Sequence, residues 1–198
     1  MKKKIAAALI IVAIVIGALY IFNNNQVNNM YDFIKLLQSG HYYLDGTYSV
    51  IGIDTPIKLA VDGDDFDVEI DSLIGNTRII LDDGKGYLIN DDNLTISVVT
   101  PEDESIKGLP DVMIDYNSFA KTGEGKNTIP GLNDETLYKY YEYTHTESNM
   151  MMRYYFKDRI LYCIHTDNGL FGSLIIINEL SKNIPNDRFK LPGNYERI

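Results

Sequence analysis

The sequence has a single cysteine, Cys163, only three histidines and no tryptophan. One cysteine excludes an intramolecular disulfide, and the cysteine and histidine spacings of zinc sites and redox pairs are absent. The serine elbow of hydrolases, the paired-histidine motif of zinc proteases and the glycine loop that binds phosphates are also missing. We therefore expect no metal, no cofactor and no catalytic residues, and we do not expect an enzyme.

Basic residues are also scarce, with 18 lysines and arginines against 28 acidic residues and a net charge of −10. Lys2, Lys3 and Lys4 lie at the extreme N-terminus, so the rest of the chain is more acidic still. Such a surface repels nucleic acid, and we expect no nucleic-acid partner. The sequence does not indicate an oligomeric state.

An uninterrupted apolar run extends from Ile5 to Phe22, without charge or proline. As a helix it would be about 27 Å long, close to the thickness of the hydrocarbon core of a membrane. The lysines before it predict that the N-terminus lies in the cytoplasm. We therefore predict that residues 1–22 form a signal anchor. The chain would be a single-pass protein of the cell membrane, with its C-terminal domain outside. A cleaved signal peptide is the alternative, but the end of the run lacks the small residues that a peptidase needs.

After a polar linker at 23–29, residues 30–198 form one predicted extracytoplasmic domain. Its first segment predicts a helix at 30–39, because Met30, Phe33, Ile34 and Leu37 recur with helical spacing. From residue 41 the apolar residues alternate, which predicts strands separated by Asp-Gly and Gly-Asn turn signals. The predicted strands are 41–52, 56–62, 65–74, 77–82, 86–90, 94–99, 136–146, 150–157, 160–167 and 172–179. Alternation is clearest where Phe66, Val68 and Ile70 interleave with acidic residues.

Prolines and glycines interrupt this pattern at about 100–135. Within this insertion Asp111 can cap a short helix at 111–119 that carries Val112, Tyr116 and Phe119 on one side. The insertion is either a functional lid or a packed excursion. The predicted fold class is mainly β (α+β), a curved antiparallel sheet or half-barrel with covering helices after the transmembrane helix.

Cys163 and His165 lie two apart on a predicted strand and raise the question of a metal site. A hairpin that pairs Lys157 with Ile160 would place Tyr154 opposite Cys163 and Met152 opposite His165. His145 would then be about 9.6 Å from His165, too far to share a zinc ion. We interpret the pair as structural.

The C-terminal part of the sequence carries a family resemblance. The residues that carry it are the hairpin Tyr154-Tyr155-Phe156 to Leu161, then Leu174-Ile175-Ile176-Ile177, Leu180-Ser181-Lys182-Asn183-Ile184-Pro185, Asp187, Phe189, Leu191-Pro192-Gly193 and Tyr195. Together they resemble the end of the lipoprotein-carrier (LolA-like) superfamily. The resemblance implies an incomplete antiparallel barrel covered by helices, with a cavity that holds acyl chains or other hydrophobic ligands.

Two hypotheses follow. In the first, a membrane lipid or lipidated protein binds in a cavity between sheet and helices. Its lid side would be Met30, Phe33, Ile34, Leu37, Val112, Tyr116 and Phe119, and its sheet side Phe66, Val68 and Ile70. In the second, the chain is a non-enzymatic envelope sensor or protein-interaction domain with a filled core.

Overall fold

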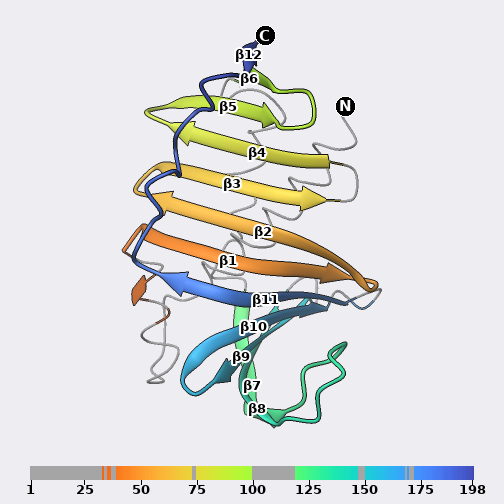
Figure 1. Ribbon diagram of the computed structural model, residues 1–198. Helices are drawn as coiled ribbons and strands as arrows, with labels where there is room; N and C mark the ends of the chain where they lie inside the picture. The colour runs from red at the N-terminus through yellow and green to blue at the C-terminus, as the bar shows by residue number, and fades with distance from the viewer. Residues whose placement is uncertain are drawn as a thin grey trace.

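The structure, a computed structural model, describes residues 33, 35–36, 39–72, 75–99, 119–146, 150–167, 169 and 172–198. These residues form a single sheet of 12 strands (Figure 1). The strands are β1 (His41–Val50), β2 (Ile53–Asp62), β3 (Asp65–Ser72), β4 (Gly75–Asp82), β5 (Lys85–Asn90), β6 (Thr95–Val99), β7 (Phe119–Asn127), β8 (Tyr138–His145), β9 (Met151–Lys157), β10 (Ile160–Asp167), β11 (Gly172–Ser181) and β12 (Glu196–Arg197).

The sheet consists of two antiparallel meanders joined by one long-range pair. Strands β1 to β6 follow one another in order, as do β7 to β11, and β1 pairs with β11. The two-residue strand β12 adds to the edge at β6, and this pair is parallel. The predicted strands are confirmed at nearly all positions, and a strand that the sequence did not reveal, β7, lies inside the predicted insertion.

Tight turns explain why the strands end where they do. Gly63 and Gly84 have φ values of +64° and +71°, the left-handed conformation that glycine adopts at no steric cost. Asp158 and Arg159, with φ values of +49° and +73°, adopt the same conformation in the two-residue loop between β9 and β10. This is the pattern of a hairpin turn whose twist matches the flanking strands, and it forms here without glycine.

The helical part of the predicted fold class is wrong. The structure is almost entirely β, and no helical element occurs among the described residues. Phe33, Lys35 and Leu36 have helical backbone, but they amount to less than one complete element. Phe119, predicted to lie on a covering helix, is the first residue of β7, and residues 111–118 lie outside the described part. The helical spacing of apolar residues at 111–119 therefore predicted the wrong secondary structure for Phe119.

The predicted membrane location is also corrected. Within the residues that the structure describes, no helix is both long enough and apolar enough to cross a bilayer. This finding contradicts the assignment as a single-pass membrane protein with a signal anchor and an extracytoplasmic domain, and we withdraw that assignment. The predicted anchor at 1–22 and the linker at 23–29 lie outside the described residues.

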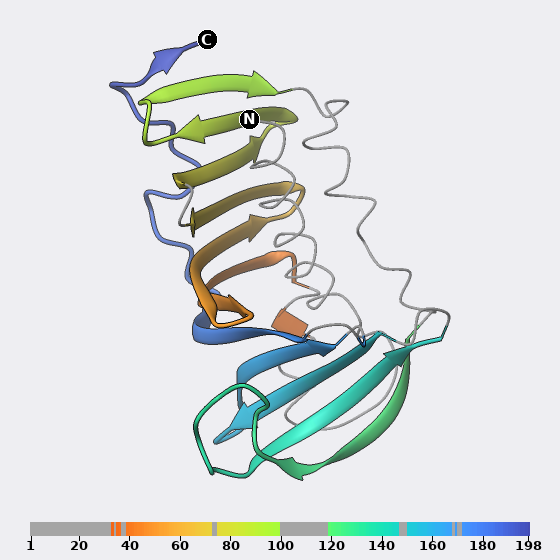
Figure 2. The ribbon, with the colours of Figure 1, turned by 90° about the vertical axis from the view of Figure 1, so that its right-hand side faces the viewer.

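The sheet is curved, and its two faces differ (Figure 2). The helical residues near Phe33 lie on the concave side, which we call the inner face, and the chain after β11 runs along the opposite, outer face. On β3, Val68 and Ile70 belong to the inner face, whereas Asp67 and Glu69 point to the outer face. The period-two alternation of this strand thus separates a core surface from a charged surface.

Residues 182–195, which we call the strap, cover the outer face of the first meander. Phe189, Leu191 and Tyr195 pack against the buried side chains of Ile80, Ile89 and Ile96. Strands β4, β5 and β6 carry apolar side chains on both faces, so their outer face would be exposed to water without the strap. The strap buries this apolar surface.

The strap is held by a buried ion cluster centred on Asp67, which is 0% exposed. Arg188 donates from its Nη2 to Asp67 Oδ1 at 2.7 Å and from its Nη1 to Glu69 Oε2 at 2.6 Å. Arg78 donates from its Nε to Asp67 Oδ1 at 2.9 Å, and the Phe189 amide donates to Oδ2 at 3.0 Å. Hydrogen bonding to Arg188 and the nearby Lys58 ammonium lower the pKa of Glu69, although burial alone would raise it.

We predict that Asp67→Asn lowers the free energy of unfolding by about 3–5 kcal/mol, because it leaves two arginines without their shared buried carboxylate. Urea denaturation followed by circular dichroism measures this loss. Asp71→Asn is the matched control, since Asp71 is an exposed aspartate on the same strand. Equal effects of the two substitutions would contradict a central role for the Asp67 cluster.

We also predict that Gly46→Ala weakens the junction between the meanders. A Cβ at Gly46 would lie 2.6 Å from the carbonyl oxygen of Ile176 on β11. Crowding of this kind costs about 1–3 kcal/mol in a packed interior. Gly193→Ala is the control, because nothing lies within 4 Å of a Cβ there. The same denaturation experiment compares the two variants, and an unchanged midpoint for Gly46→Ala would refute the close approach.

Candidate functional site

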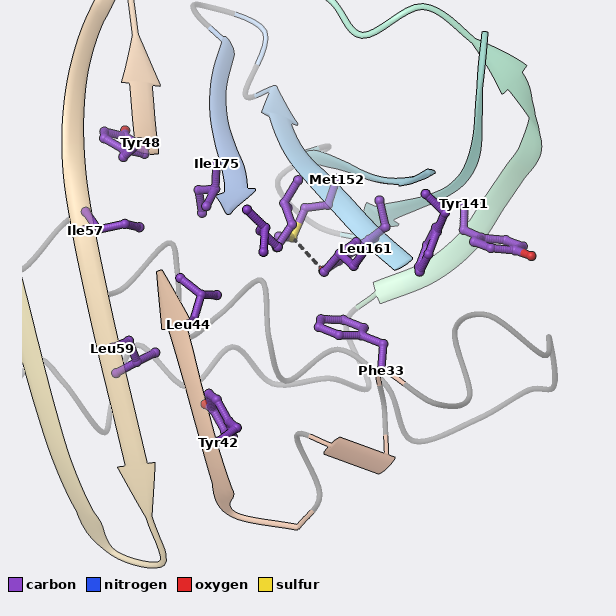
Figure 3. Close-up of a cluster of buried hydrophobic side chains, with 14 of the residues drawn as sticks. Phe33, Tyr42, Leu44, Tyr48, Ile57, Leu59, Tyr141, Met152, Leu161 and Ile175 are labelled. Atoms are coloured by element: carbon purple, nitrogen blue, oxygen red, sulfur yellow. Dashed lines mark hydrogen bonds between the residues drawn. The ribbon is translucent and has the colours of Figure 1, made fainter. Parts of the chain in front are cut away.

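The inner face carries one apolar cluster that extends across both meanders (Figure 3). Its members come from seven strands and from Phe33. They are Phe33, Tyr42, Leu44, Tyr48, Ile57, Leu59, Val68, Ile70, Tyr141, Tyr143, Met152, Tyr154, Phe156, Leu161, Ile164, Ile175 and Ile177, all buried. Strands β1, β2 and β3 supply one side and β8 to β11 the other, so the cluster follows the curve of the sheet.

Strand register explains how residues distant in sequence meet here. Tyr48 lies opposite Ile175 in the β1–β11 pair, and Ile175 lies opposite Ile164 in the next pair. Tyr141 and Tyr154 are opposite one another on β8 and β9. Opposite residues point to the same face, so each pair extends the apolar layer by one strand.

Tyrosines give this layer a partly polar character. The rings of Tyr143 and Tyr154 meet edge-on with centroids 6.0 Å apart, and Tyr141 meets Phe156 in the same way at 5.7 Å. Such edge-to-face contacts are favourable arrangements for aromatic rings. Burial, with smaller effects from Tyr141 and Glu124, raises the pKa of Tyr143 to about 12, so this phenol stays neutral at physiological pH.

The Tyr141 hydroxyl is a buried oxygen without a hydrogen-bond partner, and the residue as a whole is 0% exposed. Phenol hydroxyls that are buried usually find a partner. A buried donor that lacks one is a candidate contact for a bound group.

The inner face becomes charged where β8 meets the edge strand β7. Glu124 lies opposite Tyr141, and Lys126 lies opposite Lys139. Lys121 donates to Glu124 Oε2 at 2.6 Å. The ammonium groups of Lys121 and Lys139 lie 5.4 and 5.0 Å from the centroid of the Tyr141 ring, within the range of cation–π attraction.

The structure places four of the sequence-predicted ligand residues together. Val68, Ile70 and Phe33 belong to the inner-face cluster, and Phe66 packs against it. The Phe33 ring lies 6.1 Å from the ring of Tyr154, so a residue from outside the sheet contacts the far meander. Met30, Ile34, Leu37, Val112 and Tyr116 lie outside the described residues. That these residues bind a ligand stays a prediction.

Sequence reasoning missed most of the inner face. Tyr42, Leu44 and Tyr48 alternate on β1, as do Met152, Tyr154 and Phe156 on β9, so period-two spacing was the available signal. Bulges interrupt this period-two spacing on other strands. Register shifts in the β1–β11 pair, at Asp45 and Gly46, and in the β9–β10 pair, at Leu161 and Cys163, change which residues share a face.

The second of these bulges corrects the predicted surroundings of Cys163 and His165. Ile160 pairs with Lys157 as predicted, but Cys163 lies opposite Tyr155 and His165 opposite Arg153. One extra residue in β10 moves the register by one position, so Tyr154 and Met152 are not the neighbours.

Cys163 belongs to an outer-face cluster with Ile129, Tyr138, Tyr155 and Leu174. Burial raises the pKa of its thiol to about 12, so the group is a neutral core side chain and not a reactive thiolate. Among the described residues, no three histidine, cysteine or acidic side chains come together in a way that suits a metal ion.

Comparisons with known proteins show a similar fold and no more. No known family model matches the sequence, and no curated protein matches it. One similar solved structure is an uncharacterised conserved protein from Thermus thermophilus. It is 8% identical with a TM-score of 0.50, and the match covers 86% of this chain and 99% of that one. Nothing in these comparisons bears on the resemblance to the lipoprotein-carrier superfamily.

We predict that His165 makes the fold sensitive to acid. Its ring is buried, and Nδ1 has no hydrogen-bond partner. Burial is the main cause that lowers the pKa of His165 from the ordinary 6.5. The charge of Asp167 raises this pKa, and the charge of Arg153 lowers it. A lowered pKa means that the unfolded chain binds the proton more tightly. The contribution of His165 is therefore complete above pH 6.5 and is lost as the pH falls below it.

Urea denaturation at pH 7.5 and pH 5 tests this prediction. His165→Gln removes the imidazole and should reduce the difference in the free energy of unfolding between the two pH values. Part of the difference should remain, because Glu69 and the other carboxylates also contribute to it. His41→Gln, at an exposed position, is the control. An undiminished difference in His165→Gln would count against the prediction.

Proposed function

We propose that the inner face binds the hydrocarbon part of an elongated hydrophobic ligand, such as the acyl chain of a lipid or of a lipidated protein. The observation that carries this proposal is the continuous aromatic and aliphatic layer on the concave side of the sheet. Ligand sites for small molecules are concave and mostly apolar, with a few placed polar groups. Tyr48, Tyr141 and Tyr154 combine an apolar ring with a polar tip, which suits such a site.

The outer face is a weaker candidate because the chain itself fills it. The strap packs on β4, β5 and β6, and Ile129 and Leu132 pack on the outer cluster around Tyr155. The buried charges of Asp67 and Arg188, with the partly buried Arg78 beside them, also make that surface unsuitable for hydrocarbon.

A protein-interaction domain with a filled core is the competing function. It is favoured by one observation: Leu44 and Tyr154 on the inner face are 0% exposed, so protein atoms already cover them. Under this interpretation the layer is structural, and no hydrocarbon enters it. Under our proposal, a ligand replaces contacts that the chain makes with this layer.

The absence of tryptophan allows a direct test. A single tryptophan placed on the inner face by Tyr48→Trp would be the protein's one indole fluorophore. We expect a brominated fatty acid, whose bromine atoms quench indole at short range, to quench this tryptophan saturably in the full chain. Tyr87→Trp is the matched control, because Tyr87 packs with the outer-face cluster around Ile80.

Equal quenching of both reporters would indicate surface adsorption, and no quenching of either would favour the filled core. Native mass spectrometry of the full chain purified without added lipid is an independent check. A co-purified lipid that leaves when the brominated acid is added would support binding at the same face.

A further inference from the structure

Among the described strands, the charged side chains of the inner face lie at its β7–β8 edge, where an apolar surface ends in basic groups. Lys121, Glu124 and Lys139 surround Tyr141 there, and the next inner-face side chains along the sheet are Tyr154 and Phe156. The opposite half of the face, on β1 to β3, contributes only uncharged side chains to the cluster. A surface that is apolar along its length and basic at one end is complementary to an amphiphile.

The two lysines are not equivalent. Lys121 is neutralised by Glu124, and the lysine ammonium holds the pKa of Glu124 below its usual value, so that carboxylate stays ionised. Within the described part of the chain, Lys139 makes no ion pair, and its ammonium lies over the Tyr141 ring. Lys139 also helps to lower the pKa of Glu124, but Lys126 lies opposite Lys139, so three lysines share this one carboxylate at the end of the apolar layer. The β7–β8 edge therefore carries an excess of positive charge.

The Tyr141 hydroxyl is the second group without a partner. It is buried, it can donate one hydrogen bond, and the ring that carries it lies beneath the Lys139 ammonium. One anionic group would accept from the ammonium and from the phenol together. Hydrogen bonds between a charged acceptor and such donors are among the stronger ones in proteins.

From this arrangement we infer that the ligand has a single anionic head group, a carboxylate or a phosphate. Lys139 and Tyr141 hold this head group at the β7–β8 edge, and the hydrocarbon lies along the inner face. The inference rests on the proposed function and specifies its ligand class. A trimethylammonium head would be repelled by Lys139, and an alcohol would gain no ionic contact.

Three probes with the same sixteen-carbon chain test this inference: hexadecanoic acid, hexadecanol and hexadecyltrimethylammonium. Each competes with the brominated fatty acid for the full chain carrying the Tyr48→Trp reporter. We expect the acid to bind about tenfold more tightly than the alcohol, the size of one charge-assisted hydrogen bond of at least 1.4 kcal/mol. The ammonium probe should bind most weakly.

Two variants assign the effect to the named groups. Lys139→Met and Tyr141→Phe should each weaken the acid by about tenfold and leave the alcohol unchanged. Lys157→Met is the matched control, because its ammonium also lies over a tyrosine ring, at 5.6 Å from Tyr162, on the outer face. Tyr141→Phe should keep or raise the unfolding midpoint, since it removes a buried hydroxyl that lacks a partner.

The outcomes separate this inference from the proposed function. If acid and alcohol bind equally and Lys139→Met changes neither, the anionic head group is refuted while hydrocarbon binding stands. If the brominated acid quenches neither reporter and no probe co-purifies with the chain, both fail. A third outcome is that inorganic phosphate binds in a Lys139-dependent manner and hexadecanoic acid binds no more tightly than phosphate. The site would then bind a free anion, and an amphiphilic ligand would be refuted.

Discussion

The pairing of β1 with β11 is the interaction on which the rest of the structure depends. Each meander forms from local hairpins, but only this pair joins them, since β1 is the first strand and β11 the last long one. The join requires close backbone contact, and Gly46 provides it beside the Ile176 carbonyl at a register shift. Because Tyr48 and Ile175 then share a face, two apolar surfaces become one layer, and the candidate ligand site exists only in the joined sheet.

The ion cluster at Asp67 determines which face of that sheet remains a candidate. A buried carboxylate needs several donors, and Asp67 obtains them from Arg78 on a neighbouring strand and from Arg188 and Phe189 in the strap. The same contacts place the apolar residues of the strap over β4 to β6. The ion cluster and the strap together cover the outer face of the first meander. The concave inner face is then the apolar surface on which we propose that a hydrocarbon lies.

The strands were predictable because β3 and its neighbours combine strict alternation with glycine turns, and both signals are local. The site was less predictable for three physical reasons. Extra residues at Asn178 on β11 and at Tyr162 on β10 shift the phase of the alternation, so counting by two assigns later residues of these strands to the wrong face. Strand β7 has glycines at 123 and 125 and little apolar alternation, because edge strands gain less from burial. The partner of Asp67 lies 121 residues away in sequence, and charge patterns do not indicate contacts at that distance.

The tyrosines illustrate why composition alone does not locate a binding face. Fifteen occur in the chain, and on β8 they occupy both faces, with Tyr138 and Tyr140 outside and Tyr141 and Tyr143 inside. Their hydroxyls differ in what surrounds them. Tyr138 donates to Asp134 in the loop before its own strand, and this bond completes the outer face from within the chain. The Tyr141 hydroxyl is buried without a partner beside the Lys139 ammonium, so at this strand the polar group that the fold leaves unsatisfied lies on the inner face. Buried polar atoms without a partner also occur on the outer face, at the Tyr155 hydroxyl and His165 Nδ1, so an unsatisfied hydroxyl alone does not identify a ligand site. At Tyr141 it coincides with a lysine ammonium and with the concave apolar layer, and this combination is what distinguishes the inner face.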